Sequence, residues 1–197
     1  MAGSESAERG LMRIFVAVFP PADVQRSAAG LIERLRAEGD GVAWVKADNL
    51  HFTVRFLGDL GESGASRAAA AVRQAAGGMP AFRAALGGPG AFPSPRKARV
   101  LWLGLSAGAE QLVALAGAVE RGLEEAGFGR ADRPFKPHLT IGRVRDRERD
   151  WSDPLASAAR PVDGESGFDV DRVVVVQSTL SPKGSVYRVR DEAPLGG

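Results

Sequence analysis

The 197-residue sequence predicts an α+β protein built from two similar lobes that face each other about a pseudo-twofold axis. Three observations support this fold class. Segments typical of strands and helices follow one another as strand, helix, strand, strand, and this order repeats in part after Met79. The composition, with 44% hydrophobic and 25% charged residues, is that of an ordinary globular protein. The only two histidines lie in segments that correspond between the two halves.

The first half opens with a buried strand and an amphipathic helix. Residues 1–10 are mostly small and polar, and we expect them to form a flexible tail. Residues 13–19 form a nearly continuous run of β-branched and aromatic side chains, which is typical of a buried strand. Apolar residues then recur at helical spacing from Ala22 to a stop at Gly39, which predicts a helix. The other elements predicted in this half are a short strand at 42–45, a longer strand at 50–57 ended by Gly58, and an alanine-rich helix at about 66–76.

The second half repeats the pattern with a loop inserted and further strands added. A strand is predicted near 82–86, and the glycine- and proline-rich segment 87–95 is predicted to be a loop. Residues 99–105 are predicted to form a strand. The amphipathic helix that follows ends at Gly127 and has an apolar stripe made of Leu112, Leu115, Ala116, Val119 and Leu123. The last predicted elements are a strand at 137–144, a loop with a short helix at 146–167, a strand at 168–177 and a strand at 186–189.

We expect these elements to form one bilobal domain over residues 11–190, followed by a flexible tail at 191–197. Cysteine is absent, which excludes thiol nucleophiles, cysteine-ligated metals and disulfides. No apolar run approaches the roughly 18 residues that a membrane span requires, and the first ten residues do not resemble a signal peptide. The sequence therefore predicts a cytoplasmic protein without a membrane partner.

Charge is nearly balanced overall but is unevenly distributed along the chain. The formal net charge is +2, yet six cations and no acid lie between Ser63 and Ala109, and eight acids lie between Asp146 and Asp171. This segregation is consistent with a basic surface for phosphates and equally with charges spread over solvated faces. The sequence leaves both interpretations open.

The feature that indicates chemistry is a repeated tripeptide of the form His-x-Thr. His51 is followed by Thr53 and His138 by Thr140, although the chain has only two histidines and three threonines. Residues i and i+2 of a strand lie on the same face, so each motif presents an imidazole beside a hydroxyl. The intervening residues and those that follow, Phe52, Val54, Leu139 and Ile141, are predicted to turn into the core.

Two imidazoles and two hydroxyls that face each other suit a phosphoryl centre. Cleavage of a phosphodiester needs a base for the attacking oxygen, an acid for the leaving oxygen, and donors for the nonbridging oxygens. Histidine can serve as either acid or base near neutral pH, because its reference pKa is about 6.5. Threonine hydroxyls are neutral donors.

A structural role and a metal site are the alternatives. A single His-x-Thr is common by chance, and a lone histidine on a strand is more often a core or surface residue than a catalyst. The repetition in a chain without other histidines favours function. Zinc or iron would need a carboxylate as a further ligand, and neither motif contains one. The sequence therefore predicts a site without metal.

The sequence resembles the two-histidine (2H) phosphoesterases, and among them the bacterial and archaeal RNA 2',3'-cyclic phosphodiesterases once described as 2'-5' RNA ligases. The resemblance extends from Arg13 to about Val189. Both His-x-Thr motifs, with FLG after the first, are specific when taken together. The supporting segments are RIFVAVFPP, WVKADNLHFTVRFLGDL, RVLWLGL, FKPHLTIGRV and STLSPKGSVY.

This resemblance implies a bilobal α+β fold in which two antiparallel sheets line a central groove with helices on the outside. It implies hydrolysis of a terminal RNA 2',3'-cyclic phosphate to a 2'-phosphate without metal or other cofactor. His51 corresponds to the general acid and His138 to the general base, with Thr53 and Thr140 holding the phosphate. Similar enzymes place an arginine where Arg143 stands.

The position of two arginines depends on how regular the strands are. Strict alternation turns Arg143 away from the groove, so it reaches substrate only if Gly142 bulges or the strand ends there. Arg55 shares the face of His51 and is therefore a second candidate for binding the anion. Further candidates flank the motifs: Lys46, Arg96, Lys97, Arg130, Arg133 and Lys136 for the RNA backbone, and Trp44, Phe92 and Phe135 for base stacking.

Other substrates and a different class of function stay open at this point. The same groups would serve a 2'-5' linked oligonucleotide or a cyclic phosphate on ADP-ribose, and reversal of the reaction would join RNA ends through a 2'-5' bond. A non-catalytic module that binds RNA ends is the alternative of another class. We expect the partner to be an RNA with a 2',3'-cyclic phosphate end, derived from tRNA, and the protein to be a monomer.

Overall fold

The computed structural model describes residues 10–37, 41–145, 149–158, 167–182 and 184–196. The tail predicted at 1–10 lies outside the described residues except for Gly10. Of the segment predicted at 146–167, residues 149–158 and 167 are described, and they include the expected short helix. The elements, in chain order, are β1 (Met12–Val18), α2 (Ala22–Ala37), β2 (Val42–Trp44), η1 (Ala47–Asn49), β3 (Phe52–Leu60), α3 (Glu62–Gly77), β4 (Phe82–Phe92), η2 (Pro95–Lys97), β5 (Val100–Ala107), α4 (Ala109–Glu125), β6 (Leu139–Val144), α5 (Ser152–Ala158), β7 (Phe168–Val170), β8 (Arg172–Ser181) and β9 (Gly184–Pro194).

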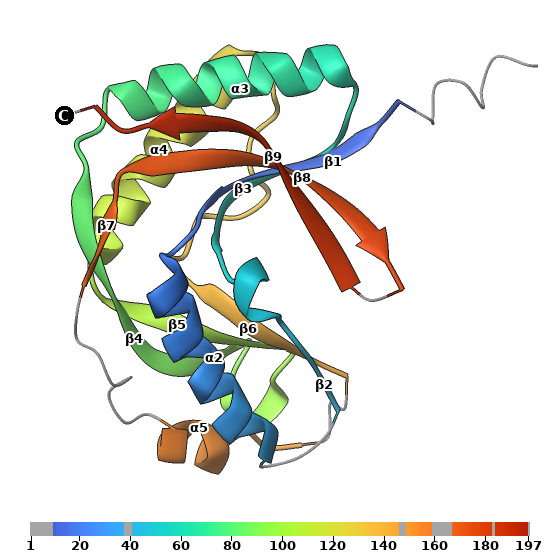
Figure 1. The fold of residues 1–197 in the computed structure, drawn as a ribbon, viewed down its shortest axis with the longest axis vertical. Coiled ribbons are helices and arrows are strands. Elements are labelled where there is room, and N and C mark those ends of the chain that lie inside the picture. Colours follow the sequence, from blue (N-terminus) through green and yellow to red (C-terminus); the bar gives the residue numbers. More distant parts are fainter. Residues whose placement is uncertain (1–9, 38–40, 146–148, 159–166, 183, 197) are drawn as a thin grey trace, which may run out of the picture.

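The strands form one antiparallel arrangement that divides into two halves. The order is β7-β4-β5-β6-β3-β1-β8-β9, with β2 added beside β6. Strands β3 and β6 pair at one position, Phe52 with Leu139, and the two halves of the sheet diverge on either side of it (Figure 1). The first lobe comprises β3, β1, β8 and β9, and the second comprises β6, β5, β4 and β7. The predicted two-lobed α+β fold is confirmed, with one curled sheet whose two halves are joined through the β3–β6 pair.

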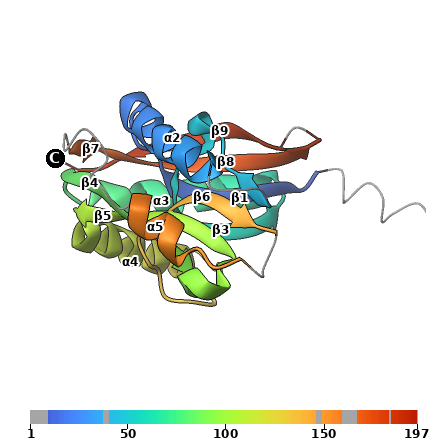
Figure 2. The same cartoon turned by 90° about the horizontal axis from the view of Figure 1, so that it is seen from below.

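The connections explain the pseudo-twofold relation. In the first lobe the chain runs from β1 through α2 to the adjacent strand β3, and in the second it runs from β5 through α4 to the adjacent strand β6. Helix α3 packs against β1, β3, β8 and β9 with α4 beside it, whereas α5 packs against β4 and α2 (Figures 1 and 2). Helices α3 and α4 therefore cover the first lobe, and α5 and α2 cover the second.

The apolar stripes predicted for two helices form the core. Every residue of the predicted α4 stripe is buried, as are the residues of the stripe on α2. These side chains belong to one cluster that includes Ile14 and Val16 of β1 and Leu101 and Leu103 of β5, so both lobes share it. Strand β1 is buried on both faces, because Phe15 and Ala17 belong to a second cluster with Val174 and Val176. Burial on both faces is why its apolar run is continuous.

Two segments predicted to be loops or strand ends continue as strands. Strand β3 passes Gly58 and extends to Leu60, because Gly58 adopts a positive φ of 75° at an irregular register with β1. The segment predicted as a loop at 87–95 is mostly strand, since β4 runs to Phe92. Its glycines serve close packing instead of a turn: a Cβ on Gly87 would lie 2.9 Å from the carbonyl carbon of Leu105.

The C-terminal part differs from the prediction in two further places. The strand expected at 168–177 is interrupted at Asp171 and forms β7 and β8. The residues expected as a tail at 191–197 instead continue β9 to Pro194, where Ala193 is fully buried. The backbone NH of Leu195 then donates to the carbonyl of Asp171.

The uneven charge of the sequence is partly neutralised in space. Three cations of the acid-free segment pair with acids from the C-terminal part, which favours the interpretation of ordinary solvated charges. The pairs are Arg73 with Asp191, Arg83 with Asp169 and Arg96 with Asp150. Within the described residues, none of the helices is long and apolar enough to cross a membrane.

Candidate active site

The two His-x-Thr motifs meet where the lobes join. The middle residues, Phe52 and Leu139, face each other in the β3–β6 pair and are 1% and 0% exposed. Strand alternation therefore places both histidines and both threonines on the opposite face, called the histidine face below. Because the strands are antiparallel, the two histidines are diagonal neighbours across this pair. Such neighbours lie about 7–8 Å apart in a regular ladder, a distance that one phosphate can bridge.

Both imidazoles are held in the same tautomer. Nδ1 of His51 lies 2.7 Å from the carbonyl oxygen of Asn49, and Nδ1 of His138 lies 2.7 Å from that of Lys136. A carbonyl oxygen only accepts, so each Nδ1 carries the proton and donates. Each Nε2 is thereby left for substrate, as a base when the ring is neutral and as an acid when it is protonated.

His51 is the more enclosed of the two. Its ring contacts those of Phe15, Phe19 and Tyr187, with centroids 4.9, 5.3 and 5.3 Å away. Burial lowers the pKa of His51 below 6.5, and the charges of His138 and Arg143 act in the same direction, while the bond to the Asn49 carbonyl opposes them. The charge of His138 therefore reaches His51, which is consistent with the two imidazoles serving one site.

The threonine hydroxyls are available for binding. Thr53 and Thr140 are both partly exposed, and within the described part of the chain neither hydroxyl has a hydrogen-bond partner in the protein. Thr140 lies directly opposite Trp102 of β5, and Thr53 directly opposite Ala17 of β1. Both neighbours lie on the histidine face, so the hydroxyls point to the side where the imidazoles lie.

A bulge decides the position of Arg143. In the β5–β6 ladder Leu101 pairs with Gly142 but Trp102 pairs with Thr140, so Ile141 is an extra residue. The extra residue returns Arg143 to the histidine face, where it is exposed. Its charge adds to the effect of burial in lowering the pKa of His51, and it opposes the rise that burial causes in the pKa of Tyr187. Gly142 permits this geometry, because a Cβ there would lie 2.6 Å from Cγ1 of Val42. The bulge beside Gly142 is the irregularity that Arg143 needs in order to reach the histidine face.

A second bulge turns Arg55 in the opposite sense. Thr53 pairs with Ala17 but Arg55 pairs with Val16, a core residue, so Val54 is the extra residue. The guanidinium Nε lies 3.3 Å from Oε2 of Glu120 on α4, and its Nη2 donates to the carbonyl of Gly129. Arg55 therefore lies against α4, on the side of the sheet opposite the histidine face.

The chain matches a known protein family over most of its length. The family model of the 2'-5' RNA ligase superfamily matches residues 20–181. The chain belongs to this superfamily. RNA 2',3'-cyclic phosphodiesterase of Thermotoga maritima is 32% identical over 186 residues, 94% of this chain and 97% of the relative. The protein of the same name from Archaeoglobus fulgidus is 36% identical over 180 residues, 90% of this chain and 97% of the relative.

Two solved structures have folds similar to that of this chain. A crystal structure of a Thermus thermophilus protein superposes with a TM-score of 0.78 at 31% identity, covering 94% of this chain and 99% of that chain. E. coli LigT, crystallised with 3'-AMP, superposes with a TM-score of 0.74 at 24% identity, covering 95% and 99%. The second similarity supports the fold.

One of the residues around the site that were not predicted from the sequence is a tyrosine. Tyr187 of β9 has its ring 5.3 Å from that of His51 and 5.1 Å from that of Phe15. Burial raises the pKa of Tyr187, while a hydrogen bond from Ser185 and the charge of Arg143 oppose the rise. Its being the only tyrosine was the available signal. The β8–β9 register that places it is not readable from the sequence.

The flanking candidates are dispersed. Trp44 packs edge-on against the buried Trp151, and Phe135 packs against the main core. Arg130 is paired with Glu124. Lys46 and Lys136 are exposed beside the motifs. Within the described residues, no three side chains of the kind that ligate metals gather in one place.

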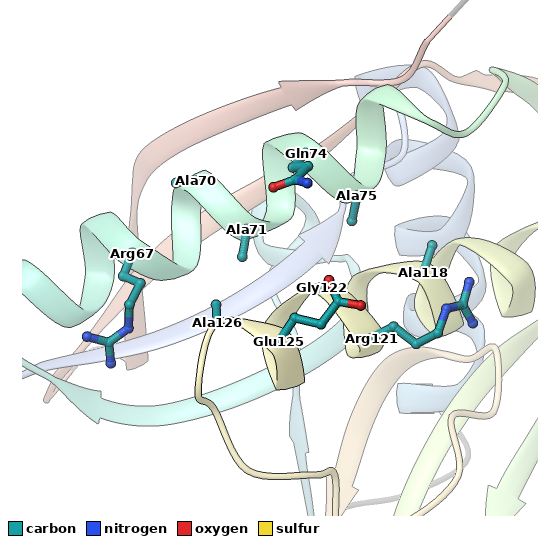
Figure 3. Close-up of a pocket in the computed structure, with 10 residues that line it drawn as sticks. All are labelled: Arg67, Ala70, Ala71, Gln74, Ala75, Ala118, Arg121, Gly122, Glu125 and Ala126. Atoms are coloured by element: carbon teal, nitrogen blue, oxygen red, sulfur yellow. The ribbon is translucent and has the colours of Figure 1, made fainter.

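A separate hollow of about 470 Å³ lies between α3 and α4 and contains none of the predicted site residues. Figure 3 shows Ala71 and Ala75 on the side of α3 that faces α4. A Cβ on Gly122 would lie 3.3 Å from the Ala71 carbonyl oxygen, so the small residues explain the close helix crossing.

The enclosure of His51 predicts its titration. We expect the His51 ring to titrate below 6.5 in NMR spectra of the folded protein, and its pKa to rise in a His138→Ala variant, which lacks one opposing charge. Because the folded-state pKa is the lower one, the unfolded chain binds more protons as the pH falls. Stability is therefore lost from about pH 6.5 downward through the folded-state pKa. A His51 resonance that titrates above 6.5 would contradict the prediction.

Proposed function

We propose that this chain is an RNA 2',3'-cyclic phosphodiesterase that hydrolyses a terminal cyclic phosphate to a 2'-phosphate. The antiparallel meeting of the two motifs at Phe52 and Leu139 carries the proposal, because it presents two imidazoles with free Nε2 atoms to one site. Relatives that carry this name are 32% and 36% identical over most of the chain.

In the proposed mechanism one histidine accepts a proton and the other donates one. Nε2 of His138 accepts a proton from water, and the water oxygen bonds to phosphorus. The bond from phosphorus to O3' breaks, and Nε2 of His51 donates its proton to O3'. The product is a 2'-phosphate beside a free 3'-hydroxyl. With a 5'-hydroxyl of RNA in place of water, the same steps form a 2'-5' bond.

The remaining groups stabilise the phosphate oxygens. Thr53 and Thr140 supply hydroxyl donors, and Arg143 supplies a positive charge for the dianionic transition state. The low pKa of His51 makes it a strong proton donor once it is charged, and the phosphate anion beside it favours the charged form. The Asn49 carbonyl contributes in the same direction by accepting from Nδ1.

The decisive test is turnover of a nucleoside 2',3'-cyclic phosphate in excess EDTA. We expect activity that EDTA does not reduce, a product that is the 2'-phosphate, and a bell-shaped pH profile because one histidine must be neutral and the other charged. Rates and products are measured by chromatography against synthetic 2'- and 3'-phosphates. Binding of the cyclic phosphate without turnover over hours would contradict the proposed enzyme and show that the protein is a module that only binds RNA ends.

The same assay separates the substrates that the sequence leaves open. A 2'-5' linked dinucleotide and a cyclic phosphate of ADP-ribose are tested beside the RNA end, and we expect the RNA end to give the highest kcat/KM. Three expectations from the sequence accompany the proposal: a tRNA-derived substrate, a monomer and a cytoplasmic location. Light scattering checks the second of these.

A further inference from the structure

Two aromatic rings lie beside His138 on the histidine face of the second lobe. Phe92 meets the His138 ring edge-on with centroids 5.2 Å apart, and it lies 5.0 Å from the ring of Trp102 at an interplanar angle of 33°. Trp102 pairs directly with Thr140, whereas its neighbours Leu101 and Leu103 are fully buried in the core. Phe92 and Trp102, called the aromatic platform below, are therefore on the side of the reacting groups.

Glycine allows the indole to lie flat against the sheet. A Cβ on Gly90, which pairs with Trp102, would lie 2.4, 2.5 and 2.9 Å from ring atoms Cζ2, Cη2 and Cε2. Distances this similar to three ring atoms place that Cβ over the ring face and not at its edge. A Cβ on Gly104 would approach the same ring at 3.4 Å. The strand β4 thus supports one face of the indole.

The surface that the platform leaves open is made of carbon. Both rings are partly exposed, yet Nε1 of Trp102 is buried and has no hydrogen-bond partner within the described residues. The platform can therefore offer stacking and apolar contact but no hydrogen bond from the indole. A ligand held here must itself present a flat, apolar face.

The two lobes differ in this respect. On the first lobe the rings of Phe15, Phe19 and Tyr187 all converge on His51 and enclose it. On the second lobe, among the described residues, Phe92 is the aromatic ring in contact with His138. The aromatic surface beside His138 is therefore formed by Phe92 and, next to it, Trp102.

We propose that the aromatic platform binds the base of the 3'-terminal nucleotide by stacking, while the cyclic phosphate lies between His51 and His138. The proposal rests on the proposed function and deepens it. Stacking accepts every base, because each has a π face, and it favours purines through their larger area. The enzyme should therefore act on RNA ends that carry any of the four bases, with a moderate preference for purines.

The test compares substrates with and without a base. Wild type, Trp102→Leu and Phe92→Leu are assayed on adenosine 2',3'-cyclic phosphate and on the base-free 1-O-methylribose 2',3'-cyclic phosphate. We expect the ratio of the two kcat/KM values to fall about tenfold in each variant, mainly through KM for adenosine. The control Phe128→Leu, an aromatic residue packed beneath Arg67, should keep the wild-type ratio. Equal losses on both substrates would overturn the proposal, because they would show that the rings only support the sheet.

A binding measurement separates this proposal from the proposed function. Adenosine 2'-phosphate should quench the fluorescence of the wild type in a saturable manner, and Trp102→Leu should lose that quenching while Trp44 and Trp151 still emit. If wild type turns over neither substrate but shows this quenching, the function fails and the platform stands. Unchanged quenching in Trp102→Leu overturns the platform whatever the activity.

Discussion

Replacing His138 with alanine is expected to lower kcat on a nucleoside 2',3'-cyclic phosphate by about 10²–10⁴-fold, the usual contribution of one positioned acid or base. His51→Asn should cost a similar factor. Asparagine is preferred at position 51, because alanine would leave a cavity among the three aromatic rings that surround His51. Initial rates at saturating substrate measure both effects.

The double variant tests whether the two histidines act in one step. Groups that act as a unit give strongly non-additive losses, so His51→Asn combined with His138→Ala should be little slower than the slower single variant. Arg83→Ala removes an exposed ion pair with Asp169 at the far edge of the second lobe and serves as a control that should keep wild-type rates. Circular dichroism confirms folding of each variant. Near-normal rates in both single variants would refute the mechanism.

Strand periodicity was sufficient to predict the centre of this site. The i, i+2 rule placed each imidazole beside a hydroxyl and sent Phe52 and Leu139 into the core, where the structure has them at 1% and 0% exposure. Helical spacing likewise predicted the buried stripe of α4. These features depend on local geometry and on burial alone, and both are written in the residue pattern.

The two arginines show where the same rule stops. Alternation placed Arg55 on the face of His51 and turned Arg143 away, and the bulges at Val54 and Ile141 reverse both positions. A bulge adds one unpaired residue and exchanges the faces of everything beyond it. Its position depends on the neighbouring strand, as at Gly142, where β2 packs too closely to admit a side chain. Such long-range contacts are absent from a local pattern.

The prediction of a loop in the glycine-rich segment of β4 was wrong for a related reason. Glycine and proline predict turns when only the chain itself is considered. In the structure Gly87 and Gly90 lie in a strand because the backbone of β5 and the ring of Trp102 approach them closely. The residues on the partner strand, and not the conformational freedom of glycine, decide this assignment.

The second large effect expected is on stability. Phe52→Ala should lower the free energy of unfolding by about 3–5 kcal/mol, because it removes a fully packed aromatic ring and leaves a cavity. The ring is 1% exposed, and its residue forms the pair that joins β3 to β6. Urea denaturation at pH 7, followed by circular dichroism, measures the change as a shift of the midpoint.

Phe56 on the same strand is the matched control, because its side chain is 48% exposed. Its ring lies beneath the guanidinium group of Arg13, 5.0 Å from the ring centroid. Phe56→Ala should cost less than about 1 kcal/mol, the usual worth of an exposed cation–π contact. Because one core cluster includes residues of both lobes, Phe52→Ala should still unfold in a single transition. Two separate unfolding transitions would show that the lobes fold independently. Equal losses of stability in the two variants would show that the Phe52–Leu139 pair does not hold the lobes, and with them the histidines, together.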